Sequence, residues 1–442
     1  MGEESSDVAA NVRRARYARS QHRARQHEDA HAESHAADTH AHASAAVPDH
    51  PGVTRGDAAL IVTEAGLAEL LAQLRAVGSF AYDSEFIGEL TYVPKLCLIQ
   101  VATTDRVALI DPLAGIELKP FWELIADESV EKITHAGQQD VEPVIRRLGR
   151  EAKNVFDTQI ACGFIGMAYP VALAKLVGEL VGAKLGKGLT FTHWDQRPLS
   201  ASQLRYAADD VRYLPALRAA IGQRLQSTGH THWAREEFDA MCDARLYQFD
   251  PETAYLRVRG ATSLTGQALA ILRELVIWRD AMSRAHDVPP RAFLKDEILI
   301  DLARSPVKSV EKLGRVRGLP RPVEHAHGTE IIDATQRGLA IPPGKFPFAR
   351  HVEPSPTERF RADTLWAAAQ CICAGKGVDP ALVTSRQEVG EFLRHAKSAH
   401  APKSSPILEG WRREALGDPL LALMKGEGRV TLDWSNGSLR AT

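Results

Sequence analysis

Large apolar residues are almost absent from the first 56 positions, and short apolar runs then alternate with helical patterns. Runs typical of strands lie at residues 60–62, 79–85, 96–102, 107–110, 132–134 and 154–156. Apolar residues spaced by three or four positions predict helices at 63–76, 120–126 and 139–148, and from there on to about residue 226. Three antiparallel strands followed by strand–helix alternation indicate an α/β domain over 57–228, with a mixed sheet of about five strands and flanking helices.

The second half of the chain has a helical pattern throughout. After a connecting segment at 229–261, residues 262–341 predict a small all-α domain with one apolar helix face, formed by Leu269, Leu272, Leu275, Val276 and Ile277. Five prolines between 342 and 356 mark a linker. Residues 357–442 predict a second small all-α domain that ends in a short strand near 430–432.

The first 56 residues consist largely of Ala, Arg, His, Asp and Glu, and they hold seven of the 17 histidines. Such a segment cannot bury enough apolar surface to offset the entropy lost on ordering, so we expect a disordered tail. A histidine-rich metal-binding tract is the alternative.

Composition narrows the class of protein only slightly. The 442 residues are 44% hydrophobic and 25% charged, as in ordinary globular proteins, and no apolar run is long enough to predict a membrane span. A net charge of −2 argues mildly against a nucleic-acid binder, although an acidic site can offset a local basic surface. Five widely spaced cysteines and a polar N-terminus without a signal-like apolar stretch favour reduced thiols and a cytoplasmic location.

Four acids and a tyrosine are the candidate chemistry. Asp83 and Glu85 are two apart on a strand and therefore share a face, while Tyr206 and Asp210 are four apart on a helix. Asp209 lies about 100° round the helix from Asp210, so spacing favours Asp210 as the partner of Tyr206. Clustered carboxylates suit divalent metal ions and phosphodiester hydrolysis.

Each of these acids also has a structural explanation. Asp83 and Glu85 could be solvated at a strand end, and the acids near Tyr206 could be solvated on a helix face. Asp140 follows a strand and a turn, near the start of a helix, where the helix dipole alone favours an acid. No single motif decides between the explanations.

Their order and flanking sequences resemble the DEDD superfamily of 3′-to-5′ exonucleases, in its tyrosine-bearing branch, and most closely the ribonuclease D family. The resemblance covers about residues 57–225. Its motifs are Asp83-Ser84-Glu85-Phe86, Pro94 to Gln100, His135-Ala136-Gly137 with Asp140, Phe156-Asp157-Thr158-Gln159, Trp194-Asp195-Gln196-Arg197-Pro198-Leu199, and Tyr206-Ala207-Ala208-Asp209-Asp210.

This resemblance implies a ribonuclease H-like fold and two Mg²⁺ or Mn²⁺ ions held by the four carboxylates. It implies that Tyr206 orients the attacking water, because a phenol with a pKa of about 10 is a poor base. It also implies release of nucleoside 5′-monophosphates from the 3′ extensions of structured RNAs, tRNA precursors first. The alternatives are a DNA exonuclease of the same superfamily and a non-catalytic RNA-binding protein.

Substrate contacts are a further expectation. Phe86, Gln100 and His135 stand in family-like flanks and are expected to touch the terminal nucleotide, although a core position for Phe86 or backbone hydrogen bonds for the other two would explain them as well. We expect the protein to be a monomer.

The helical domains resemble HRDC domains, which are small nucleic-acid-binding modules. The motifs are Leu264 to Leu269, Val288 to Leu294 and Leu313 to Leu319 for the first domain, and Gly377 to Pro380 and Leu408 to Glu414 for a more divergent second one. Arg315 and Arg317, in a cluster of basic residues, are expected to contact phosphates in a sequence-independent and salt-sensitive way. A solvated basic face is the alternative.

Overall fold

The computed structural model describes residues 47–186, 193–264, 266–347, 355–396, 405–435 and 438–441 of the 442. Most of the predicted tail, up to residue 46, lies outside this range. The boundary at residue 56 is wrong, because Val53 and Thr54 are already buried in the fold. The carbonyl of Thr54 accepts a hydrogen bond of 2.7 Å from Arg212. Local composition could not predict this contact, because the two residues are 158 positions apart.

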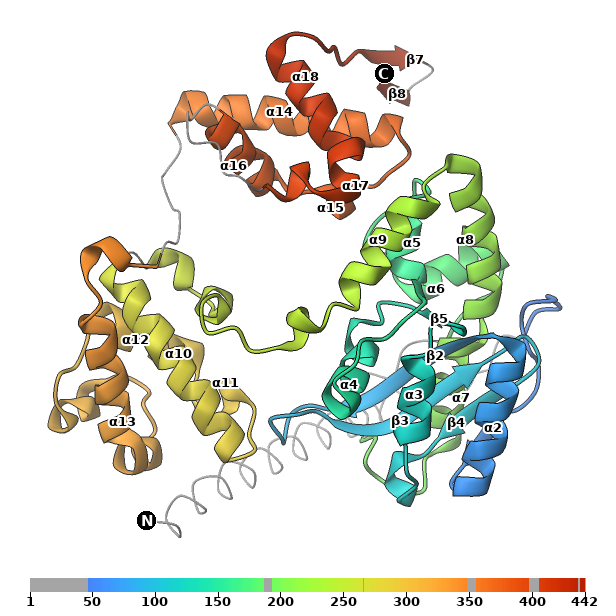
Figure 1. Cartoon of the computed structure of the whole chain (residues 1–442), viewed down its shortest axis with the longest axis horizontal. Coiled ribbons are helices and arrows are strands. Elements are labelled where there is room, and N and C mark those ends of the chain that lie inside the picture. Colours follow the sequence, from blue (N-terminus) through green and yellow to red (C-terminus); the bar gives the residue numbers. More distant parts are fainter. Residues whose placement is uncertain are drawn as a thin grey trace, which may run out of the picture. The chain divides into compact units, whose positions relative to one another are not determined.

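A six-stranded mixed sheet forms the centre of the N-terminal domain (Figure 1). Its order is β1-β4-β3-β2-β5-β6, for β1 (Ala59–Ile61), β2 (Ser79–Ile87), β3 (Lys95–Ala102), β4 (Val107–Ile110), β5 (Glu131–Thr134) and β6 (Val155–Asp157). Strands β3 and β4 are antiparallel, whereas β1 runs parallel to β4 and β5 runs parallel to both β2 and β6. The mixed sheet is confirmed, but the expected count of five is wrong by one.

The helices of this domain begin and end where the sequence provides caps. Helix α2 (Glu64–Val77) starts at Thr63, whose side chain accepts from the Gly66 amide, and it ends at Gly78 with φ of 75°. Its buried face consists of Leu67, Leu70, Leu71 and Leu74, as the sequence pattern predicts. The other helices are α3 (Lys119–Ile125), α4 (Gln138–Leu148), α5 (Thr158–Gly163), α6 (Leu173–Leu176), α7 (Ala201–Arg212), α8 (Leu214–Thr228) and α9 (Thr231–Met241).

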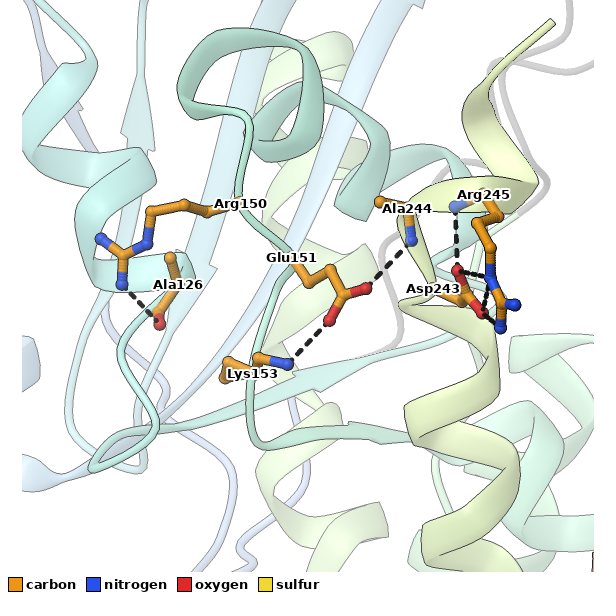
Figure 2. Close-up of polar contacts among 7 residues, drawn as sticks. All are labelled: Ala126, Arg150, Glu151, Lys153, Asp243, Ala244 and Arg245. Carbon is orange, nitrogen blue, oxygen red and sulfur yellow. Dashed lines mark hydrogen bonds and ion pairs between the residues drawn. The ribbon is translucent and has the colours of Figure 1, made fainter.

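The loop between α4 and β6 is tied to the residues that follow α9 (Figure 2). The Glu151 carboxylate accepts from the Lys153 ammonium at 2.8 Å and from the Ala244 amide at 3.2 Å. Beside it, Arg245 donates from Nε to Asp243 at 2.9 Å. These bonds fasten the loop that links α4, which carries Asp140, to β6, which carries Asp157.

Contacts divide the described chain into two compact units. One holds Phe86–Leu96 and Gln248–Glu353, and the other holds Ala43–Glu85, Cys97–Tyr247 and Pro354–Thr442. Apart from the end of β2 and the start of β3, the first unit is helical, with α10 (Gln267–Ala285), α11 (Pro290–Phe293), α12 (Asp296–Arg304) and α13 (Arg321–Leu339). Its core includes Leu272, Leu275 and Trp278, and a buried Arg279–Asp296 ion pair of 2.8 Å joins α10 to α12.

The last domain lies in the second unit and comprises α14 (Pro356–Gly375), α15 (Pro380–Val383), α16 (Arg386–Ala396), α17 (Gly410–Arg412), α18 (Asp418–Lys425), β7 (Leu432–Ser435) and β8 (Ser438–Ala441). It contacts α9, because the Trp411 indole and the Arg412 guanidinium both donate to Glu237. The expected single terminal strand is instead one arm of an antiparallel pair, β7 with β8. Across the described ranges, no helix combines the length and apolar character that a membrane crossing requires.

Candidate active site

Strand β2 and helix α7 bring three carboxylates together. Ligand oxygens of Asp83, Glu85 and Asp210 all lie within 4.8 Å of one another, and these acids form the one such group found among the described residues. The spacing of two on a strand correctly predicted that Asp83 would lie beside Glu85. No spacing within one element could predict that α7, more than 100 positions later, would bring Asp210 to the same place.

Helix α7 begins with a capping box, in which Ser200 and Gln203 satisfy each other's backbone amides. Four residues apart on this helix, the Tyr206 hydroxyl hydrogen-bonds to the Asp210 carboxylate. Asp209 is engaged elsewhere, with Oδ1 at 3.1 Å from Nε of Arg212. The structure therefore separates the two neighbouring acids as the helical spacing predicted.

Asp140 lies in the first turn of α4, buried, and outside the group of three. Burial raises the pKa of Asp140 well above its ordinary value, and the charge of Asp83 raises it further. The pKa of Asp140 therefore depends on the charge of the cluster, through Asp83.

Asp157 organises the turn that precedes α4. Its carboxylate accepts from the Thr134 hydroxyl at 3.0 Å and from the Gly137 amide at 2.8 Å. A Cβ on Gly137 would lie only 2.5 Å from Thr134, so the turn requires glycine there. The other carboxylate oxygen of Asp157 caps α5. The sequence showed Asp157 only as part of a family motif, because Thr134 and Gly137 lie 23 and 20 positions away along the chain.

Burial, and for two of the three acids the charge of a neighbour, raises the pKa values of the cluster. Burial raises the pKa of Asp83 to about 6. Burial and the charge of Asp83 raise the pKa of Glu85 to about 8, and burial with both of those charges raises the pKa of Asp210 to about 9. The pKa of Tyr206 is also raised, first by burial and then by Asp210.

A positive ion placed among these oxygens would reverse each of these shifts, because it favours the carboxylate form. The donor set consists of oxygens alone, as Mg²⁺, Mn²⁺ and Ca²⁺ prefer. The residues present therefore fit a divalent metal site.

The predicted substrate contacts fall in different surroundings. Phe86 is half-buried on β2, and Gln100 is fully buried, with no hydrogen-bond partner for its amide among the described residues. His135 is half-buried, with Nδ1 at 3.0 Å from the Thr158 hydroxyl. Arg315 and Arg317 are exposed in the helical domain that contains α10 to α13.

Comparison with known proteins agrees with this geometry. Residues 59–226 match the family model of a 3′-5′ exonuclease, and residues 268–335 match that of the HRDC domain. Ribonuclease D of Gluconacetobacter diazotrophicus is 34% identical over 381 residues, which cover 85% of this chain and 95% of the relative. Ribonuclease D of Nitrobacter hamburgensis is 33% identical and covers 85% of this chain and 97% of its own.

The crystal structure of Escherichia coli RNase D, described as an exoribonuclease involved in structured RNA processing, superposes with a TM-score of 0.73 at 28% identity. That match covers 85% of this chain and all of the other. The 3′-5′ exonuclease fold implies dependence on divalent metal ions, and the acidic cluster is where they fit. The chain therefore belongs to the ribonuclease D family, as a 3′-5′ exoribonuclease with an HRDC domain.

Proposed function

We propose that Asp83, Glu85, Asp140 and Asp210 hold two divalent ions, Mg²⁺ or Mn²⁺, and that this centre removes nucleotides from the 3′ end of RNA. The observation that carries the proposal is the convergence of three carboxylates within 4.8 Å, where burial and the charge of Asp83 raise the pKa of both Glu85 and Asp210. Bound metal ions would supply an activated water and stabilise the charge that develops on the phosphate and the leaving 3′-oxygen.

Tyr206 orients the water in this proposal. Burial and Asp210 raise the pKa of Tyr206, so the phenol stays protonated at neutral pH and can donate or accept a hydrogen bond but not act as a base. Its hydrogen bond to Asp210 fixes the direction of the hydroxyl. The ring is also packed against Trp194, with a centroid separation of 6.2 Å.

The substrate we propose is the 3′ extension of a structured RNA, with tRNA precursors as the first candidates. The role of the E. coli relative in structured RNA processing supports this choice. At the terminal nucleotide, we propose contacts from Phe86 and His135, whose side chains are only partly buried. Gln100 is fully buried, and in this proposal it supports the site without touching the nucleotide directly.

The choice of RNA over DNA has a direct test, because only RNA carries the 2′-hydroxyl. Matched single-stranded RNA and DNA oligonucleotides, labelled at the 5′ end, are digested under identical conditions. We expect faster shortening of the RNA, one nucleotide at a time, with nucleoside 5′-monophosphates as products and no digestion when the 3′ end carries a phosphate. Equal rates on both oligonucleotides would favour a DNA exonuclease instead.

Within the HRDC domain, we propose that Arg315 and Arg317 contact RNA phosphates. Both are exposed, and no ion pair is found for either among the described residues. The double variant Arg315→Ala/Arg317→Ala is expected to weaken binding of a tRNA precursor about tenfold and to make its affinity less dependent on salt. The measurement is fluorescence anisotropy at several salt concentrations.

Arg337→Ala is the matched control in the same domain, because Arg337 is already paired with Glu274 at 3.2 Å. We expect near wild-type affinity and the wild-type salt slope for this variant. An unchanged slope in the double variant as well would favour the solvated basic face.

We also propose a monomeric cytoplasmic protein. The five cysteines, all in the described ranges, form no disulfide, which supports the location.

A further inference from the structure

Arg197 is bonded through every nitrogen of its guanidinium group. Nε and Nη2 reach the two carboxylate oxygens of Asp111, each at 2.6 Å. Nη2 also donates to the carbonyl of Cys97 at 2.8 Å, and Nη1 donates to the carbonyls of Trp194 and Gln196, each at 2.8 Å. Five hydrogen bonds are the full donor capacity of an arginine.

We propose that Arg197 is a positioning residue, which fixes where α7 presents Tyr206 and Asp210 to the acids of β2. The inference rests on the proposed metal site. Arg197 itself touches none of the four acids in the structure, and it acts through the backbone.

The bonded groups lie at the junction that such a role requires. Cys97 belongs to β3 and Asp111 directly follows β4, so both belong to the sheet. Arg197 lies three residues before Ser200, the N-cap of α7. Through this one side chain, the segment that leads into α7 is fastened to the sheet.

A short path leads from the guanidinium to the site. Trp194, whose carbonyl accepts from Arg197, is buried and packs against the Tyr206 ring at 6.2 Å between centroids. A shift of the segment would therefore displace the ring that carries the water-orienting hydroxyl.

The other end of α7 is held in a comparable way. Arg212, in the last turn, donates to the carbonyls of Thr54 and Gly56 at 2.7 and 3.0 Å. With both ends fastened, the helix has little freedom to slide or tilt relative to β2. Asp210 then meets Asp83 and Glu85 before any ion is bound, which is the preorganisation that a metal centre needs.

The surroundings of Asp111 keep it in its charged carboxylate form beside Arg197. Burial acts to raise the pKa of Asp111, but the hydrogen bonds from Arg197 and from the Leu113 amide outweigh burial and keep it below its ordinary value. Lysine would keep the charge at position 197 but could not form the planar two-point contact with Asp111 and reach three carbonyls as well. Arg197→Lys therefore changes geometry while it preserves charge.

The matched control is Arg218→Lys. Arg218 is a partly buried arginine of the same domain, bonded from Nε to Glu131 at 2.9 Å and stacked on the Phe156 ring at 4.3 Å. It lies on α8 and pairs with β5, away from the segment that leads into α7. A general loss of arginine contacts should affect both variants alike.

Four quantities are measured for the wild type and both variants: kcat and KM on a single-stranded RNA, Mn²⁺ affinity by calorimetry without RNA, and the melting temperature. For Arg197→Lys we expect a 10- to 100-fold lower kcat, because small displacements of reacting groups have effects of about this size. We also expect KM within about twofold and Mn²⁺ affinity at least about threefold weaker. Arg218→Lys should lower the melting temperature while kcat and Mn²⁺ affinity stay at wild-type values.

Wild-type kcat and Mn²⁺ affinity in Arg197→Lys would overturn the inference, as would an equal loss in Arg218→Lys at an equal melting temperature. If Arg197→Lys does not fold, Asp111→Asn takes its place, because it removes the charge of the partner and keeps its shape. The same losses in that variant support the inference, and wild-type values overturn it. A wild-type protein that binds Mn²⁺ but degrades no RNA would contradict the proposed function, and the calorimetric comparison would still decide the role of Arg197.

Discussion

Asp83→Asn is expected to reduce RNA hydrolysis by about 10³-fold or more and to leave RNA affinity within about twofold of the wild type. Asp83 lies at the centre of the acidic group, since its charge raises the pKa of Glu85, Asp140 and Asp210. Asparagine keeps the size of the side chain but removes the negative charge that would hold metal ions. The RNA-binding surface that we propose on the HRDC domain is unaffected. Single-turnover digestion and fluorescence anisotropy measure the two properties.

Neighbouring aspartates on α7 provide a matched pair for the same experiment. Asp210→Asn should resemble Asp83→Asn, whereas Asp209→Asn should keep activity within a few-fold of the wild type, because Asp209 bonds to Arg212 rather than to the cluster. The reverse ranking of the two variants would show that the metal ligands have been assigned to the wrong face of the helix. Retained activity in Asp83→Asn would contradict the site as a whole.

Glu85→Gln is expected to be inactive and yet more stable than the wild type at pH 9 in the absence of divalent metal. The pKa of Glu85 is raised from 4.5 to about 8, so the folded protein holds this proton more tightly than the unfolded chain does. The stability that comes from this difference is fully present below pH 4.5 and is lost as the pH rises through about 8. Glutamine is neutral at every pH and escapes the loss.

The pKa values of Asp83 and Asp210 are also raised, to about 6 and about 9, so their contributions to stability are likewise lost as the pH rises. Metal-free wild-type protein should therefore lose free energy of unfolding as the pH rises from 5 to 9. Glu85→Gln should show a smaller loss.

Urea unfolding at the two pH values, with EDTA and then with Mn²⁺, measures these differences. Mn²⁺ should restore more stability to the wild type than to Glu85→Gln, so that the ranking at pH 9 reverses. Glu123→Gln, an exposed position on α3, is the control and should follow the wild type in both solutions. A wild type more stable than Glu85→Gln at pH 9 without metal would contradict the repulsion on which the metal assignment depends.

Local periodicity was sufficient to predict most of the elements and the shared faces of the site. Spacing of two on a strand placed Asp83 beside Glu85, and spacing of four on a helix placed Tyr206 with Asp210 and excluded Asp209. These are relationships within one element, so a single window of sequence contains them. The prediction of Asp140 depended on its family-like flanks, since a helix start attracts acids without any site.

Relationships between distant segments could not be read in this way. The bonds of Asp111 to Arg197, 86 positions away, and of Arg212 to Thr54, 158 positions away, arise only when the chain folds. All six strands of the sheet were predicted as separate runs, and only their number in one sheet was underestimated. The second arm of the terminal β7–β8 pair was missed, because a strand of four residues depends on its partner for stability. The complete burial of Gln100 likewise reflects its strand neighbours rather than its own polarity.

Anomalous diffraction from crystals grown with Mn²⁺ tests the central claim most directly. The account predicts two Mn²⁺ positions about 3.5–4 Å apart, ligated by Asp83, Glu85, Asp140 and Asp210, with Tyr206 within hydrogen-bond reach of a water on one of them. The account would be contradicted by Mn²⁺ found only outside this cluster, or by crystals of fully active protein that contain no bound Mn²⁺.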